Sequence, residues 1–280
     1  MSRLAPAAER LTAVLLTAAV VPGPPVLVVE LMGSAAHELD DLRRATDEVV
    51  SRALSDLLEA SADPQSSGLA LPSDSELDPD TDPDPDPVQL VVVGPGEPGE
   101  FDASGSVSFA GFGRDIVVPA LLGGGRNAGE LPTSIMVARY LASRDLAVHP
   151  EHAGLWTSAR WATTRGADAA ALGERLRAES SRVALILVAD GATCHGPKAP
   201  RAEDARAKGY DDETCEALAS GEPGRLAQVD RGLGDALGAT GQQLWPVLVA
   251  AAGGDMIGEV AWAGAPYGVG WAVASWRRSS

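Results

Sequence analysis

The chain has 280 residues, of which 45% are hydrophobic, and this is enough for a sizeable core in one or two domains. Its formal net charge of -17 disfavours non-specific binding to nucleic acids, because phosphate contacts need clustered Lys and Arg. The same charge disfavours binding to anionic membrane surfaces. We therefore expect neither nucleic acid nor membrane as a partner.

The first apolar run, Leu11 to Val21, resembles the core of a signal peptide because Arg3 and Arg10 precede it. Pro22-Gly-Pro-Pro25 follows without a small-x-small cleavage site, so we favour a first core strand and a tight turn. No stretch is long and apolar enough to span a membrane. Two cysteines are few for a secreted domain held by disulfides, so we expect free thiols and a cytoplasmic protein.

A segment rich in Ser, Asp, Gly and Pro follows at about residues 62–87 and contains Asp78-Pro-Asp-Thr-Asp-Pro-Asp-Pro-Asp-Pro87. Such a tract cannot bury enough apolar area to offset the entropy of ordering, so we expect a disordered, acidic surface insertion. The aspartates could bind calcium, but the alternating prolines oppose the tight loop that such a site needs. Alternatively, Asp74 to Asp86 could dock a basic partner protein.

The remaining chain alternates between predicted strands and helices. His37 to Ala60 has apolar residues at three- and four-residue spacing, which predicts an amphipathic helix. Six apolar residues from Val183 to Val188 predict a strand that is buried on both faces. The other predicted elements are a strand at 88–93, a hairpin or short irregular strands at 107–118, helices at 132–143, 168–180, 224–237 and 244–252, a partly helical stretch at 202–218, and a closing strand at 269–275. This alternation is typical of an α/β sheet.

The strand at 183–188 is followed by an abruptly polar turn that holds Asp190, Cys194 and His195. An open α/β sheet usually has its ligand crevice at such strand ends. His195 could act as a general acid or base, since its unperturbed pKa lies near neutral pH, or it could be a hydrogen-bonded structural histidine. Cys194 could act as a nucleophile only with another histidine, because adjacent side chains point in different directions. Asp190 could orient a ligand, but aspartate before glycine is also ordinary turn chemistry.

Other motifs are weaker. His149 and His152 have a spacing that a helix could use for metal binding, but Pro150 between them favours a loop. Gly94-Pro-Gly-Glu-Pro-Gly99 has the glycine spacing of a dinucleotide site, yet its prolines and the lack of a following helix oppose that function. The sequence has no Gly-x-Ser-x-Gly, no phosphate-binding Gly-x-x-x-x-Gly-Lys and no Cys-x-x-Cys.

Three stretches combine a buried strand or its end with a glycine-rich turn. They are Val20-Val-Pro-Gly-Pro-Pro-Val-Leu-Val28, Leu90-Val-Val-Val-Gly-Pro-Gly96 and Asp190-Gly-Ala-Thr-Cys-His-Gly-Pro197. Together they resemble the LigB-type catalytic subunits of class III extradiol ring-cleavage dioxygenases, to which Memo-like proteins are related. Ala265-Pro-Tyr-Gly-Val-Gly-Trp271 is closer to a divergent actinobacterial branch that has no assigned reaction. The resemblance implies one α/β domain over residues 1–280, with three layers (α/β/α), a largely parallel or mixed central sheet, and a homo-oligomer or second subunit as partner.

In active members of that family, two histidines at the ends of the first two strands and one glutamate hold Fe(II). This sequence has Pro22-Gly-Pro-Pro25 and Gly94-Pro-Gly96 at the two strand ends, so neither histidine has a counterpart. Glu259 is a weak candidate for the glutamate, and the acid–base histidine corresponds to His195. We therefore expect no metal site and no cofactor, with Fe(II) expected only if the chain works as the active relatives do.

The leading hypothesis is a LigB-like protein that has lost the Fe(II) site and binds a small molecule or a protein partner. His195 and Asp190 are its predicted site residues. The alternative hypothesis is an enzyme, either a ring-cleavage dioxygenase with replaced ligands or a metal-free lyase or hydrolase that uses His195 and Asp190.

Overall fold

The computed structural model of the protein describes residues 14–62, 87–127, 129–179 and 181–278. At its centre is a seven-stranded mixed sheet. Its strands, in spatial order, are β3 (Gly99–Phe101), β7 (Arg160–Thr164), β2 (Val88–Pro95), β8 (Arg182–Val188), β1 (Val14–Val21), β10 (Trp271–Arg277) and β9 (Ile257–Gly264). The four strands β7, β2, β8 and β1 run parallel, whereas β3, β10 and β9 are antiparallel to their neighbours.

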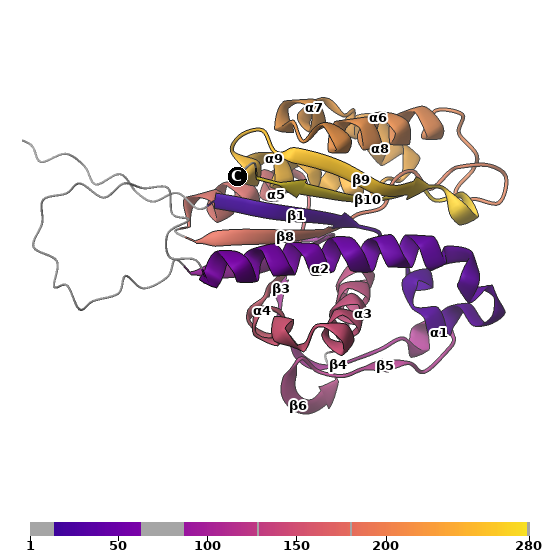
Figure 1. Cartoon of the computed structure of the whole chain (residues 1–280). Coiled ribbons are helices and arrows are strands. Elements are labelled where there is room, and N and C mark those ends of the chain that lie inside the picture. Colours follow the sequence, from indigo (N-terminus) through magenta and orange to yellow (C-terminus); the bar gives the residue numbers. More distant parts are fainter. Residues whose placement is uncertain (1–13, 63–86, 128, 180, 279–280) are drawn as a thin grey trace, which may run out of the picture.

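Helices cover both faces of this sheet, which confirms the three-layer α/β/α architecture (Figure 1). One layer contains α2 (Asp40–Ala62), α3 (Thr133–Val148) and α4 (Ala153–Ser158). The other contains α5 (Gly166–Ala178), α6 (Ala207–Ser220), α7 (Pro223–Gln228), α8 (Arg231–Leu237) and α9 (Trp245–Ala252). The central strand β8 explains why two layers are needed. Its alternate residues Ala184 and Ile186 pack toward α2, while Leu185 and Leu187 pack toward α5 and α9.

A second, three-stranded sheet lies beside the α3 layer, with β4 (Ser104–Ser108) between β5 (Val117–Val118) and β6 (Leu122–Asn127). β4 and β5 are short and antiparallel, in agreement with the prediction of a hairpin or short irregular strands at 107–118. Short helical segments complete the described chain: α1 (Val29–Met32) and the 3₁₀ helices η1 (Pro25–Leu27), η2 (Gly33–Leu39), η3 (Ala110–Phe112), η4 (Pro150–His152), η5 (Gly241–Gln243) and η6 (Pro266–Gly268).

The prediction of one helix at 224–237 is wrong, because the structure has two helices there. α7 ends at Gln228, and Asp230 then begins α8 as its N-cap. The Asp230 Oδ1 accepts a hydrogen bond from the Leu233 backbone N–H at 2.9 Å, which satisfies a donor that the first helical turn leaves free. The sequence also gave no indication of β7, whose residues Arg160–Thr164 have neither an apolar run nor strict alternation.

The structure describes only part of the segments and features on which the sequence made predictions. Residues 63–86 of the acidic insertion, including Asp74 to Asp86, lie outside the described residues. Leu15 to Val21 of the first apolar run belong to β1, at the middle of the sheet, as expected for a core strand. Cys194 and Cys215 are both free thiols. Within the described ranges, none of the helices has the length and apolar character needed to cross a membrane.

Candidate functional site

The end of β8 places Asp190 beside the loop that follows β1. Val21 and Val188 are partners in the parallel ladder, so both loops leave the sheet at the same edge. The Gly23 backbone N–H donates to Asp190 Oδ1 at 3.0 Å, and the Asp190 backbone N–H donates to Thr240 Oγ1 at 3.0 Å. Burial raises the pKa of Asp190 to about 6, although the Gly23 hydrogen bond opposes this shift. The carboxyl group can therefore change its protonation state near neutral pH.

His195 is held by a carboxylate that comes from a different element. Its Nε2 lies 2.6 Å from Asp211 Oδ2 on α6, and the two side chains are 16% and 17% exposed. Asp211 Oδ1 also accepts the Ala192 backbone N–H at 3.0 Å. With an ionised Asp211 the Nε2–H donates, so Nδ1 is the nitrogen left to accept a proton or a ligand hydrogen bond. Burial raises the pKa of Asp211, against the effects of the Ala192 and His195 hydrogen bonds.

Two glycines leave the space that the Asp211 carboxylate occupies. A Cβ atom added to Gly270 would overlap Asp211 Oδ2, and one added to Gly191 would lie 2.5 Å from Asp211 Oδ1. Backbone hydrogen bonds join the same segments, from Gly191 N–H to the Gly270 carbonyl at 2.7 Å and from His195 N–H to the Gly268 carbonyl at 3.0 Å. The turn after β8 and the loop before β10 therefore form one packed unit around the His195–Asp211 pair.

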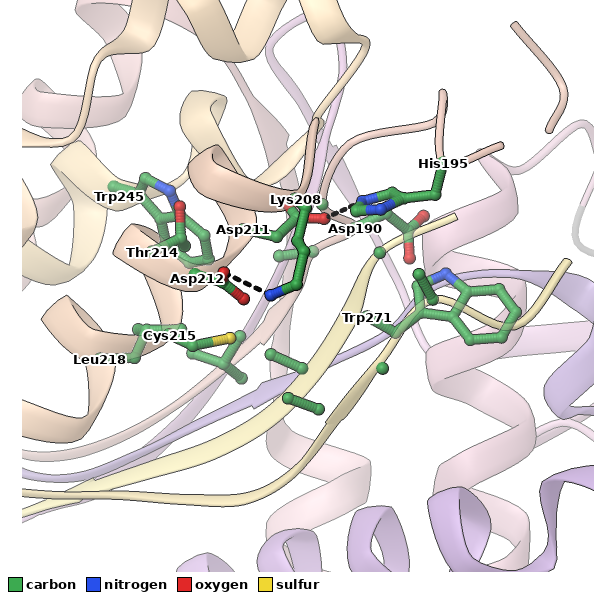
Figure 2. A pocket seen from close by; sticks show the side chains of 18 residues that line it. Asp190, His195, Lys208, Asp211, Asp212, Thr214, Cys215, Leu218, Trp245 and Trp271 are labelled. Atoms are coloured by element: carbon green, nitrogen blue, oxygen red, sulfur yellow. Dashed lines mark hydrogen bonds and ion pairs between the residues drawn. The ribbon is translucent and has the colours of Figure 1, made fainter. Parts of the chain in front are cut away.

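Asp190, His195 and Asp211 line one cavity of about 340 Å³ that lies between α6 and the strands β1, β10 and β9 (Figure 2). Its walls are mainly apolar and include Trp245 and Leu218. Further polar groups come from α6: Lys208, Asp212, Thr214 and Cys215. Lys208 Nζ pairs with Asp212 Oδ2 at 2.6 Å, and both of these side chains are largely exposed. A mostly apolar concavity with a few converging polar groups is the usual form of a small-molecule site.

The two cysteines occupy different surroundings. Cys194 is buried in the core, and its Sγ donates to the Leu237 carbonyl at 3.6 Å. Burial raises the pKa of the Cys194 thiol, which disfavours the thiolate that a nucleophile needs. Cys215 lines the cavity, but burial raises its thiol pKa to about 11. The residues therefore give no support to a cysteine nucleophile paired with His195.

The residues at the ends of β1 and β2 do not fit a site for Fe(II) with two histidines. A Cβ atom on Gly94 would overlap Ser134 Oγ at the start of α3, and one on Gly23 would lie 2.8 Å from Val188 Cγ1. A side chain at Gly23 or Gly94 would therefore displace Val188 or Ser134, and at Gly96 the φ of +147° disfavours any residue with a side chain. Glu259 lies on the outer strand β9, where it pairs with Arg52 at 3.5 Å, and it does not line the cavity.

The structure thus brings the two predicted site residues, His195 and Asp190, to one cavity, and it adds Asp211, which the sequence did not indicate. Asp211 follows His195 by 16 residues, within a stretch that was predicted only as polar and partly helical. The four-residue spacing of Asp211 and Cys215 places both on one helix face, but nothing in the sequence links that face to His195. His149 and His152 lie elsewhere, on the α2–α3 side of the sheet.

A comparison of the sequence with protein-family models finds no matching family, and a search of curated proteins finds no similar one.

Proposed function

We propose that this protein is a divergent LigB-type protein that has lost the iron site and binds a small molecule in the cavity beside His195. The observation that carries the proposal is the convergence of Asp190 with the His195–Asp211 pair on one largely apolar cavity. The packing of Gly94 against Ser134 supports the loss of iron, because a ligand side chain there would displace α3. A protein partner at the same cavity is the other form of this hypothesis.

The charges around the cavity favour a cationic or neutral ligand over an anionic one. Asp190, Asp211 and Asp212 contribute carboxyl groups, and no arginine is among the described lining residues. Lys208 already has Asp212 as its ion-pair partner, and His195 is hydrogen-bonded to Asp211. The formal charge of the whole chain, -17, also attracts cations. The ligand we propose has a compact apolar body, which packs near Trp245, and an amine or hydroxyl group, which binds the aspartates and His195.

The test uses three probes of similar size and different charge: 2-phenylethylamine, 2-phenylethanol and phenylacetate. Titration is followed by calorimetry and by tryptophan fluorescence. We expect the amine to bind at least about tenfold more tightly than the alcohol, a difference of about 1.4 kcal/mol, and phenylacetate to show no saturable binding. Asp190→Asn should reduce the affinity for the amine to that for the alcohol. Glu259→Gln is the matched control, because it removes an exposed carboxylate that lies outside the cavity.

Each outcome bears on a different part of the proposal. Equal binding of the amine and the alcohol would support a ligand site but contradict the preference for a cation. Absence of binding by all three probes would contradict the proposed ligand class. Catechol ring cleavage by protein that was purified anaerobically with Fe(II) would contradict the loss of the iron site.

Acid–base catalysis without a metal is a second candidate function, and the His195–Asp211 contact favours it. A base whose ring is oriented by a carboxylate is the usual arrangement for proton transfer, and Asp190, with a pKa of about 6, could serve as the acid. If a turnover of an amine or alcohol substrate is found, His195→Ala should abolish it. Turnover that survives this substitution would leave ligand binding as the function of the cavity.

A further inference from the structure

Glu151 and His152 lie on the 3₁₀ helix η4, between α3 and α4, and His149 is the N-cap of this helix. One ring nitrogen of each histidine and one carboxylate oxygen of Glu151 lie within 4.8 Å of one another. Pro150 occupies the first position of this helix, where its missing N–H is not needed, and so it shapes the turn instead of breaking it. The turn therefore brings the two histidines together, although the sequence favoured a loop.

The buried ring of His152 is held in a definite orientation. Its Nδ1 lies 2.8 Å from Asp145 Oδ2, and its side chain is 1% exposed. Asp145 also accepts hydrogen bonds from Trp156 Nε1 at 2.8 Å and from Ser51 Oγ at 2.7 Å, so three side chains fix the position of its carboxylate. A proton on Nδ1 leaves the lone pair of Nε2 in the neutral ring, and Nε2 has one long contact, 3.4 Å, with Ser55 Oγ. Histidines that bind metals usually donate their other ring N–H to a carboxylate in this way.

The separation of the two rings suits a shared metal ion. The ring centroids of His149 and His152 are 5.1 Å apart and the rings are stacked, with planes inclined by 24°, so the partly exposed His149 ring has to rotate to direct a nitrogen at an ion shared with His152. With Zn–N bonds of about 2.0–2.1 Å and tetrahedral angles, two imidazoles on one ion have centroids roughly 5 Å apart. Glu151 and His149 are 58% and 35% exposed, so their side chains can close the remaining gap by rotation. The exposed side of the cluster leaves room for water as a fourth ligand.

We propose that His149, Glu151 and His152 form a site for a divalent transition-metal ion of the Zn²⁺ type. Two imidazoles and one carboxylate suit this class of ion better than Mg²⁺ or Ca²⁺, which prefer oxygen ligands. The site is separate from the His195 cavity, since η4 packs on the α2–α3 side of the sheet. It goes beyond the proposed function and departs from the expectation that the protein has no metal ligands.

The test is a titration of the full-length protein, without a histidine tag and stripped with a chelator, against Zn²⁺ in competition with a chromophoric chelator. We expect one saturable equivalent. His149→Ala and Glu151→Gln should each weaken binding at least about tenfold, while leaving the buried His152–Asp145 pair in place. Co²⁺ bound to the same site should give visible absorption bands that His149→Ala removes.

Two variants serve as controls. His37→Ala removes a surface histidine that also has a carboxylate partner, Asp40 at 3.0 Å, but has no third donor in the cluster. His195→Ala removes the histidine of the cavity. Both should bind Zn²⁺ as the wild type does. The proposal is overturned if no saturable Zn²⁺ binds, if His149→Ala binds as tightly as His37→Ala, or if His195→Ala abolishes binding.

Discussion

In the part of the chain that the structure describes, two histidine–aspartate pairs are buried or half-buried, one in each helical layer, and they differ in what else the aspartate does. In the His195–Asp211 pair the atoms are 2.6 Å apart, and both side chains retain about a sixth of their surface exposed. In the His152–Asp145 pair the atoms are 2.8 Å apart, and the side chains are 1% and 3% exposed. Similar hydrogen-bond geometry thus occurs at a cavity wall and in a closed core.

The two aspartates differ in the number of hydrogen-bond donors that they accept from and in how accessible their histidine partner is. Asp145 accepts from side chains of α2, η4 and α4, so it joins three elements of one layer. Asp211 accepts one backbone amide besides His195, and the pair opens on the cavity. Asp145, with three side-chain donors, ties its layer together besides orienting the His152 ring, whereas Asp211 orients a ring that faces a cavity large enough for an organic ligand. The number of donors and the access to the ring, more than the pair itself, separate the two aspartates.

Asp145→Ala should have the largest effect on stability, because it leaves His152, Trp156 and Ser51 without their partner. Loss of one member of a buried pair typically costs about 3–5 kcal/mol. Asp211→Ala should cost less, about 1–3 kcal/mol, because its partners are fewer and half-buried. Urea unfolding followed by circular dichroism measures both free energies. Equal costs would show that the two pairs contribute alike and would contradict the comparison.

Gly270→Ala should disturb the accessible pair alone. The added methyl group overlaps Asp211 Oδ2 and also approaches His195 Nε2 to 3.2 Å, so we expect a cost of about 1–3 kcal/mol together with weaker binding of 2-phenylethylamine. Gly254→Ala is the matched control, since no heavy atom lies within 4 Å of its added Cβ. In an Asp211→Ala background the cost of Gly270→Ala should shrink. A cost that persists unchanged there would place the clash elsewhere.

The elements of the fold also differ in how well the sequence predicts them. The α2 helix and the β8 strand could be predicted because their burial follows a regular pattern, one with helical spacing and one with six consecutive apolar residues. β7 could not be, because Arg160–Thr164 is buried mainly through its neighbours β2 and β3 and not through an apolar sequence. Tertiary packing determines that strand.

The candidate site was predictable only at the end of β8, where polar residues follow a buried strand. Asp190 and His195 come from that turn, and the α/β rule for strand ends indicates both. Asp211 could not be assigned, because its contact with His195 depends on how α6 packs over Gly191 and Gly270. The partner of His152 was missed for a similar reason, since Asp145 reaches it across the bend between α3 and η4.

Asp190 gives the smallest and most specific prediction. The pKa of Asp190 is raised to about 6 in the folded protein, against about 4 in the unfolded chain. Between about pH 4 and pH 6, the folded state therefore keeps a proton that the unfolded state has already released. The resulting stabilisation is fully present below about pH 4 and is lost as the pH rises through 6. Between pH 5 and pH 8 the free energy of unfolding should therefore fall by about 1 kcal/mol through this group.

Asp190→Asn isolates that contribution, because asparagine keeps the shape of the side chain and does not titrate. Urea unfolding of both proteins at pH 5 and pH 8 should show the variant gaining about 1 kcal/mol relative to the wild type at the higher pH. Glu259→Gln, at an exposed position, should show no such gain. If Asp190→Asn follows the wild type at both pH values, the carboxyl group titrates as an ordinary surface aspartate. The cavity would then hold a fully ionised carboxylate at neutral pH, which would strengthen the preference for a cationic ligand and remove Asp190 as a candidate acid.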